Sequence, residues 1–153
     1  MPANITPVYS KLSRVSAGGT TLTFRYSTST ATASTTYDAT GTLDTSVWEA
    51  FKADATNGSF LRSIVCKIVN QTAGVAAVVR FFINNGSTNA TNTNNGLYKE
   101  LTLPAITAGG TASTPDFEIP CNIMLGPSYR ILYQFGSTAP GNAWMIYGVG
   151  GDY

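Results

Sequence analysis

The sequence predicts an all-β protein: an antiparallel β-sandwich, with the jelly roll as one candidate topology, preceded by an extended N-terminal arm. Three observations favour this class. Apolar and polar residues alternate over several short segments, as they do in half-buried strands. Turn signals built from Gly, Pro and Asn separate these segments, and no segment carries a confident helical pattern. We therefore expect about eight or nine strands in two packed sheets.

The length of 153 residues suits one domain, and we expect residues 17–153 to form a single β-sandwich domain. Residues 1–16 contain Pro2 and Pro7 and have no core face of their own, which predicts an extended arm that is disordered or docked on a neighbour. The N-terminus has no apolar run long enough for a signal peptide, and no later stretch approaches a membrane span. These features predict a soluble protein made in a cytoplasm, with no membrane partner.

The first strand is expected at residues 20–27, where Leu22, Phe24 and Tyr26 alternate with polar residues. Residues 27–42 are rich in Ser and Thr and have little to bury. They predict either an edge strand or a long surface loop.

Residues 43–55 are ambiguous. Ser46 and Glu49 have the spacing of a capping box, which would suit a short helix. Trp48, its β-branched neighbours and the turn signal at residues 56–59 favour a strand instead. We expect a strand.

The next segments give clearer patterns. Residues 60–70 are apolar on both parities, as in a central strand that is covered on both sides. Ala77, Val79, Phe81 and Ile83 alternate with Arg80 and Asn84, and the alternation resumes at residues 97–103. These two halves predict an antiparallel hairpin whose Asn/Thr/Gly loop, residues 84–96, is an exposed tip and not a ligand site.

The last strands are expected at residues 117–125, 129–135 and 143–149. Pro120 cannot donate a ladder hydrogen bond, so the first of these should lie at a sheet edge or be broken there. Cys66 and Cys121 lie in apolar strand-like runs, which favours buried free thiols, with a disulfide as the alternative.

Catalytic and ligand-binding signals are few. The chain contains no His, which removes the Ser/His/Asp triad and His-based zinc sites. Asp116 and Glu118 lie two apart and could form a carboxylate pair, but simple exposure at a strand start is the more economical interpretation. The sequence therefore predicts no enzymatic activity, no metal site and no cofactor.

The charge pattern argues against nucleic acid as a partner. The formal net charge is +1, and the basic residues are scattered singly instead of clustered as phosphate binding requires. Only 11% of residues are charged, which is typical of proteins that pack against others or are displayed in arrays.

A possible interface is predicted from parity. Trp144 and Ile146 occupy the parity of the final strand that we assign to the outside, and Leu132 does so on the strand before it. Exposed apolar groups on adjacent strands suggest a subunit contact. The alternative is that another sheet of the same domain covers them. Pro7 and Tyr9 of the arm are further candidate contact residues.

Four segments of the chain form an ordered set of strand and turn motifs: VAAVVRFFINNGS (75–87), LYKELTLPA (97–105), IPCNIMLGPSYRILYQFGS (119–137) and AWMIYGVGGDY (143–153). Together they resemble small β-rich virion proteins of tailed phages. The resemblance extends over roughly residues 57–153 and leaves the N-terminal part and the inserted loop TNATNTNN unmatched.

This resemblance implies a capsid decoration, or cement, protein on the outside of a phage head, made in the host bacterial cytoplasm. Its implied partners are the major capsid protein and further copies of itself, most simply as a trimer. A receptor- or glycan-binding module of a tail or head fibre is the alternative, since Tyr37, Trp48, Tyr98 and Trp144 could stack on sugars.

Overall fold

The computed structural model describes residues 9–12, 34–69, 73–106, 109, 113–136, 140 and 144–153, and of residues 9–12 it describes the backbone path. The expectations for Pro2, Pro7 and a strand at residues 20–27 fall outside these ranges. The strands are β1 (Tyr9–Leu12), β2 (Trp48–Lys52), β3 (Ser59–Ile68), β4 (Ala77–Asn84), β5 (Asn95–Leu103), β6 (Phe117–Leu125), β7 (Arg130–Phe135) and β8 (Trp144–Asp152), with a short 3-10 helix η1 at Asn92–Asn94.

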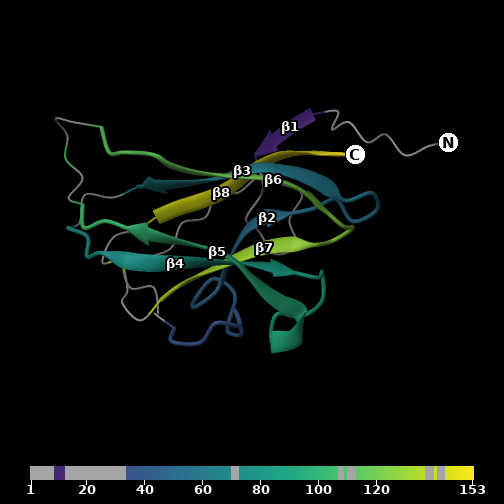
Figure 1. Cartoon of the computed structure of the whole chain (residues 1–153), viewed down its shortest axis with the longest axis horizontal. Coiled ribbons are helices and arrows are strands. Elements are labelled where there is room, and N and C mark those ends of the chain that lie inside the picture. Colours follow the sequence, from purple (N-terminus) through teal and green to yellow (C-terminus); the bar gives the residue numbers. More distant parts are fainter. Residues whose placement is uncertain are drawn as a thin grey trace.

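The strands form two four-stranded antiparallel sheets that pack face to face (Figure 1). Sheet 1 has the order β1-β8-β3-β6, and sheet 2 has the order β2-β7-β4-β5. The strands therefore pair as β1 with β8, β2 with β7, β3 with β6 and β4 with β5. This nested pairing is the strand order of a jelly roll, so the predicted β-sandwich and its jelly-roll form are confirmed.

Aromatic side chains fill the space between the sheets. Trp48 stacks on Tyr133 with ring centroids 5.5 Å apart, and Phe135 meets Trp48 edge-on at 5.6 Å. On the sheet 1 side, Trp144 lies 5.9 Å from Phe117. Such ring pairs add roughly 0.5–1.5 kcal/mol each to the burial of apolar area, so they contribute substantially to holding the two sheets together.

Several expectations for single elements are confirmed. The hairpin is present as β4 and β5, and within residues 43–55 the chain forms strand β2 at Trp48–Lys52 and no helix. Strand β3 is central, between β8 and β6. Strand β6 is the edge strand that Pro120 predicts, and the β3–β6 register shifts next to the Ser63–Pro120 pair.

The outer face of sheet 2 is covered by the chain itself. Figure 1 shows residues 34–47, in dark blue, on the side of sheet 2 that faces away from sheet 1. Ala39 and Val47 of this segment pack on Phe82 and Leu132, and all four are fully buried. Residues 34–42 are a loop without a strand, which is the second of the two forms expected for residues 27–42.

Candidate functional site

The predicted interface of Trp144, Ile146 and Leu132 is wrong. Trp144 and Ile146 point into the core between the sheets and are 1% and 0% exposed. Leu132 is fully buried under residues 39–47, and its strand β7 belongs to the other sheet. None of the three side chains can contact a partner without opening the fold.

The error comes from parity. Both parities of residues 143–149 are apolar, so alternation alone does not say which side faces inward. The glycines carry the missing signal: a Cβ on Gly148 would lie 2.7 Å from Phe51, so this position needs a residue without a side chain. Gly148 shares its parity with Trp144 and Ile146, which identifies that parity as the one packed against sheet 2.

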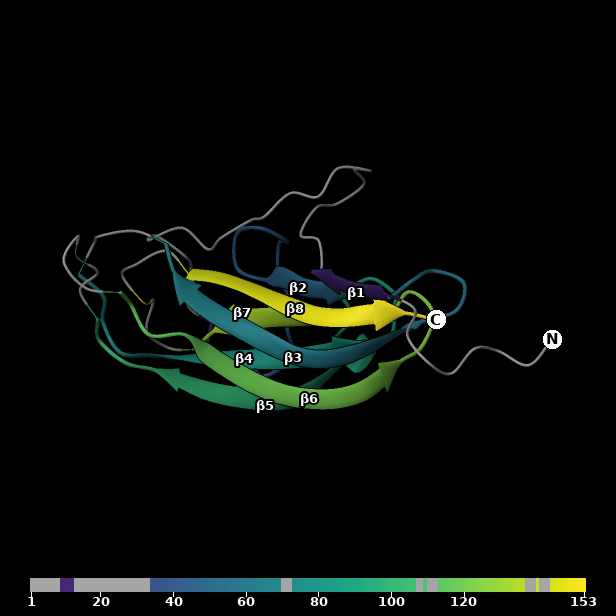
Figure 2. The same ribbon diagram turned by 90° about the horizontal axis from the view of Figure 1, so that it is seen from above.

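The side of sheet 1 that faces away from the core is a candidate contact surface, and we call it the outer face of sheet 1. Figure 2 views the molecule from this side, with β1, β8, β3 and β6 in order across the sheet. Cross-strand pairs share a face, so Val65 lies beside Tyr147, and Phe60 lies beside Met124. Val65, Tyr147 and Phe60 are half-buried, whereas Met124 is 73% exposed.

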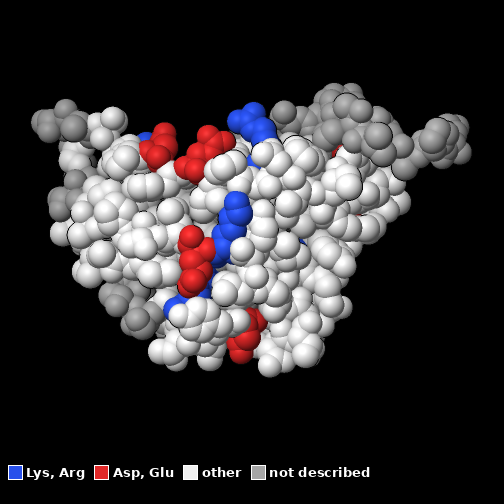
Figure 3. All heavy atoms as spheres, viewed as in Figure 1, with Lys and Arg blue, Asp and Glu red and all other residues white. Residues whose placement is uncertain are grey.

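Ion pairs flank these apolar groups. Lys67 Nζ lies 2.6 Å from an oxygen of Asp116, and Arg62 lies 3.6 Å from Glu118. Each pair joins β3 to β6 or to the residue preceding it, so the charges on this face neutralise one another. In the view of Figure 3, most acidic and basic groups lie close to one another along the middle of the molecule, and most of the remaining described surface is uncharged.

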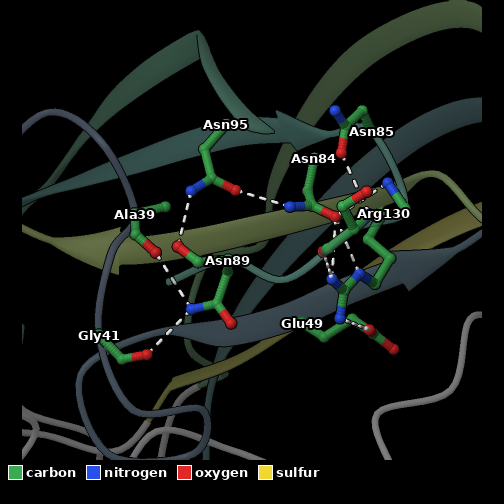
Figure 4. A network of polar contacts seen from close by, with 10 residues as sticks. Ala39, Gly41, Glu49, Asn84, Asn85, Asn89, Asn95 and Arg130 are labelled. Atoms are coloured by element: carbon green, nitrogen blue, oxygen red, sulfur yellow. Dashed lines mark hydrogen bonds and ion pairs between the residues drawn. The ribbon is translucent and has the colours of Figure 1, made fainter. Parts of the chain in front are cut away.

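Most of the hairpin loop between β4 and β5 is exposed, as expected, but three of its asparagines form a buried polar network that the sequence did not predict. The Asn84 amide donates to Asn95 Oδ1 over 2.7 Å, and the Asn95 amide donates to the carbonyl of Asn89 over 2.9 Å (Figure 4). The Asn89 amide donates in turn to the carbonyls of Ala39 and Gly41. Asn84, Asn89 and Asn95 are all buried, so the loop is pinned to residues 39–41.

Arg130 extends this network across sheet 2. Its Nε and one terminal nitrogen donate to Asn84 Oδ1 over 3.1 and 2.9 Å, and the same terminal nitrogen reaches the carbonyl of Ser87. Glu49 on β2 lies 3.9 Å from the guanidinium, as Figure 4 shows. Because these polar groups bind one another, the network works as a structural clamp instead of offering open positions to a ligand.

A second clamp holds residues 34–37. The guanidinium of Arg80, on β4, donates to the carbonyls of Ser34 and Thr36 and pairs with Glu100 at 3.0 Å. It also lies 3.7 Å from the ring centroid of Tyr37, within the range of a cation–π contact. Arg80 is 6% exposed, so its charge stabilises the fold and is not presented to a partner.

The cysteines are both free thiols, as expected. Burial raises the pKa of Cys66 to about 12, and burial likewise raises the pKa of Cys121. A thiolate is the reactive form of cysteine, so Cys66 has almost none of it at neutral pH. Asp116 and Glu118 each pair with a cation instead of with each other, and within the described ranges no group of three acidic or Cys side chains is placed to hold a metal.

The aromatics proposed for sugar stacking divide into two groups. Trp48 and Trp144 are buried in the core, at 3% and 1% exposure, and have no face available. Tyr37 is 57% exposed and Tyr98 is half-buried. One face of Tyr37 is occupied by Arg80, so the described chain offers little of the stacking platform on which the glycan alternative depends.

The arm residue Tyr9 lies on β1, which pairs with the end of β8 and places Tyr9 opposite Asp152. Among the described residues, no helix has the length and apolarity to span a membrane. Comparison with protein-family models, with curated proteins and with solved structures found no match.

Proposed function

We propose that this chain is a non-enzymatic structural protein of a phage virion, a capsid decoration or cement protein that binds adjacent major capsid proteins on the outside of the head. The proposal rests on the sequence resemblance over residues 57–153 and on one structural observation. That observation is the outer face of sheet 1, which presents apolar side chains between charges that are already paired.

This face suits a partner whose surface is also largely uncharged. Ion pairs within the chain leave no strong field of one sign, so docking depends on apolar contact and shape more than on charge steering. Each contact can be weak, because a protein that binds many equivalent positions on a symmetric shell gains avidity from their number. The jelly roll is itself common in viral capsid and lectin domains, which is an analogy of fold and carries less weight than the face.

The proposed partners are the major capsid protein and other copies of this chain, with a trimer as the favoured assembly. A compact sandwich with aromatic core packing and two internal polar clamps unfolds slowly, which suits a protein that must persist on a particle. The proposed location is therefore the capsid surface, after synthesis in the host cytoplasm.

The test is binding to heads assembled without this protein. Met124→Asp places a charge on the outer face of sheet 1 at a 73% exposed position, where it should leave the fold unchanged. We expect it to weaken head binding at least about tenfold, or ~1.4 kcal/mol, because the charge must lose water in the contact. Leu97→Asp is the matched control. Leu97 is 46% exposed on edge strand β5 and pairs with Phe82, so it lies in sheet 2, away from the outer face of sheet 1.

Three results would contradict the proposal. Wild-type protein that does not bind such heads, or virions whose cryo-EM density lacks it, would remove the cement function. If the wild type binds but Met124→Asp and Leu97→Asp lose binding equally, the head-binding function stands, and the outer face of sheet 1 is not its basis.

A further inference from the structure

β1 is attached to the sandwich along one edge only. Its residues Tyr9–Leu12 pair antiparallel with the end of β8, in a register that sets Leu12 opposite Val149. β1 is the outermost strand of sheet 1 and pairs with no other described strand, as Figure 2 shows. Its backbone attachment is thus a ladder of four residue pairs, which an identical strand from another molecule would form equally well.

The connection after β1 is long. Residues 13–33 separate β1 from Ser34, whose amide donates to the carbonyl of Phe135 on sheet 2 over 2.9 Å. A chain of that length reaches at most about 70 Å when extended. A compact domain of this size has a radius of gyration of roughly 15 Å and is therefore about 40 Å across. β1 can consequently reach the β8 edge of a neighbouring molecule while Ser34 stays in place.

The other edge strands lack this freedom. β5 is joined to β4 by the hairpin loop of residues 85–94, and the hydrogen bond from Asn84 to Asn95 closes that loop at 2.7 Å. β6 contributes Phe117, Ile119 and Ile123 to the margin of the core. β2 contributes Trp48 and Phe51 to the core centre. Removing either β2 or β6 would open the sandwich.

Exchange of β1 between molecules conserves the ladder and changes only which chain supplies it. In dilute solution β1 pairs with β8 of its own chain, because the tether gives it a high effective concentration there. That concentration is about millimolar for a flexible tether and falls as the tether lengthens. Copies that sit side by side on a shared surface reach similar local concentrations. Pairing between molecules should therefore compete with pairing within one molecule when copies are crowded.

We propose that β1 is an exchangeable strand that pairs with β8 of a second copy of this chain when copies are crowded together. A molecule that lends its β1 leaves its own β8 edge unpaired, and an unpaired edge favours pairing with another strand. Reciprocal or cyclic exchange fills every edge and gives a closed symmetric assembly. The crowding on a phage head rests on the proposed function, whereas the exchange itself does not require it.

A mixture of two proteins, each with one introduced cysteine, tests the exchange directly. Leu12→Cys and Val149→Cys are made separately, both with Cys121→Ser, while Cys66 stays because it is fully buried. Directly opposed residues of antiparallel strands have the Cα separation that a disulfide requires. Because each protein carries one of the two thiols, a bond between them forms only when β1 of one molecule pairs with β8 of the other.

We expect disulfide-linked heterodimers whose share rises with concentration, from a small minority at micromolar to a large share near millimolar protein. Tyr9→Cys mixed with Val149→Cys is the register control. Tyr9 lies opposite Asp152, about 10 Å along the strand from the partner of Val149, so this mixture should stay unlinked. A single chain carrying both Leu12→Cys and Val149→Cys reports pairing within one molecule and should close internally at low concentration.

The proposal is overturned if the mixture gives no heterodimer at any concentration while the doubly substituted chain closes internally. It is equally overturned if the doubly substituted chain does not close, because β1 then does not hold this register on β8. Head binding is measured separately. Linked heterodimers without head binding would refute the cement function alone, and head binding without heterodimers would refute exchange alone.

Discussion

Two serines on β3 provide a controlled comparison of the same substitution in different hydrogen-bonding surroundings. Ser59 and Ser63 are both buried, at 0% and 2% exposure. The Ser59 hydroxyl accepts from the Asp54 amide over 2.8 Å and donates to Asp152 Oδ1 over 2.5 Å, which ties the β2–β3 turn to the end of β8. The Ser63 hydroxyl is buried without any hydrogen-bond partner.

Alanine at these positions should have opposite consequences. Ser59→Ala removes one hydrogen bond to a backbone amide and one to a carboxylate, worth roughly 0.5–1.5 and 1.5–3 kcal/mol. Some of that loss is recovered through other contacts of Asp54 and Asp152, so we expect the free energy of unfolding to fall by about 2 kcal/mol. Ser63→Ala removes an oxygen that is desolvated without compensation, so stability should stay constant or rise by up to about 1 kcal/mol.

Urea unfolding measures both effects, with the midpoint shifting at constant m-value if the substitutions act on the folded state. The difference of about 2–3 kcal/mol corresponds to roughly 4–12 °C in Tm for a chain of this size. Equal destabilisation by the two alanines would refute the reasoning, because it would mean that the hydroxyl volume and not its hydrogen bonds determines the cost. Ser59→Thr, which keeps the hydroxyl, should recover part of the lost stability only if the bonds matter.

Three further predictions concern the core. Gly148→Ala should lower the free energy of unfolding by about 1–3 kcal/mol, seen as a lower Tm, because its Cβ would lie within 3 Å of core side chains. Gly109→Ala is the control: its Cβ would have nothing within 4 Å, so stability should change by less than about 0.5 kcal/mol. Gln134→Leu should leave urea stability unchanged or raise it, since both amide atoms of Gln134 are buried without partners, and a large loss would indicate a partner such as bound water. Burial raises the pKa of Cys66 from 9.0 to about 12, so unfolding at a pH between these values releases a proton. The free energy of unfolding should therefore fall as pH rises through that range, by up to about 1.4 kcal/mol per pH unit. Cys66→Ala should lose this part of the pH dependence.

Alternation predicted the strands well where one face of a strand is more polar than the other. Arg80 and Asn84 mark the outward parity of β4 because each needs hydrogen bonds that the apolar core cannot supply. Pro120 marked an edge strand for a similarly local reason, since it lacks an amide hydrogen to give to a neighbour. Features that depend on one residue's own chemistry were therefore visible in the sequence.

The candidate contact surface was not predictable by the same route. Val65 lies beside Tyr147, and Phe60 lies beside Met124, only because β3 pairs with both β8 and β6. These pairings join residues about 60 to 80 positions apart in the chain. The buried asparagines of the hairpin loop were missed for a related reason: Asn89 is buried because residues 39–41, about 50 positions earlier in the chain, fold over it. Burial of a polar residue by a distant loop leaves no periodic trace at the residue itself.

The two outer faces of the sandwich have different uses, and this asymmetry bears on how the protein can bind. The outer face of sheet 2 is covered by residues 34–47, whose backbone carbonyls accept hydrogen bonds from Arg80 and Asn89. Displacing that segment would break the hydrogen bonds that the guanidinium and the amide donate to its carbonyls, at a cost of several kcal/mol. Sheet 1 requires no such rearrangement, because Met124 and its half-buried neighbours are already accessible. A partner can therefore contact the outer face of sheet 1 without unfolding any described segment, which supports that face as the proposed docking side.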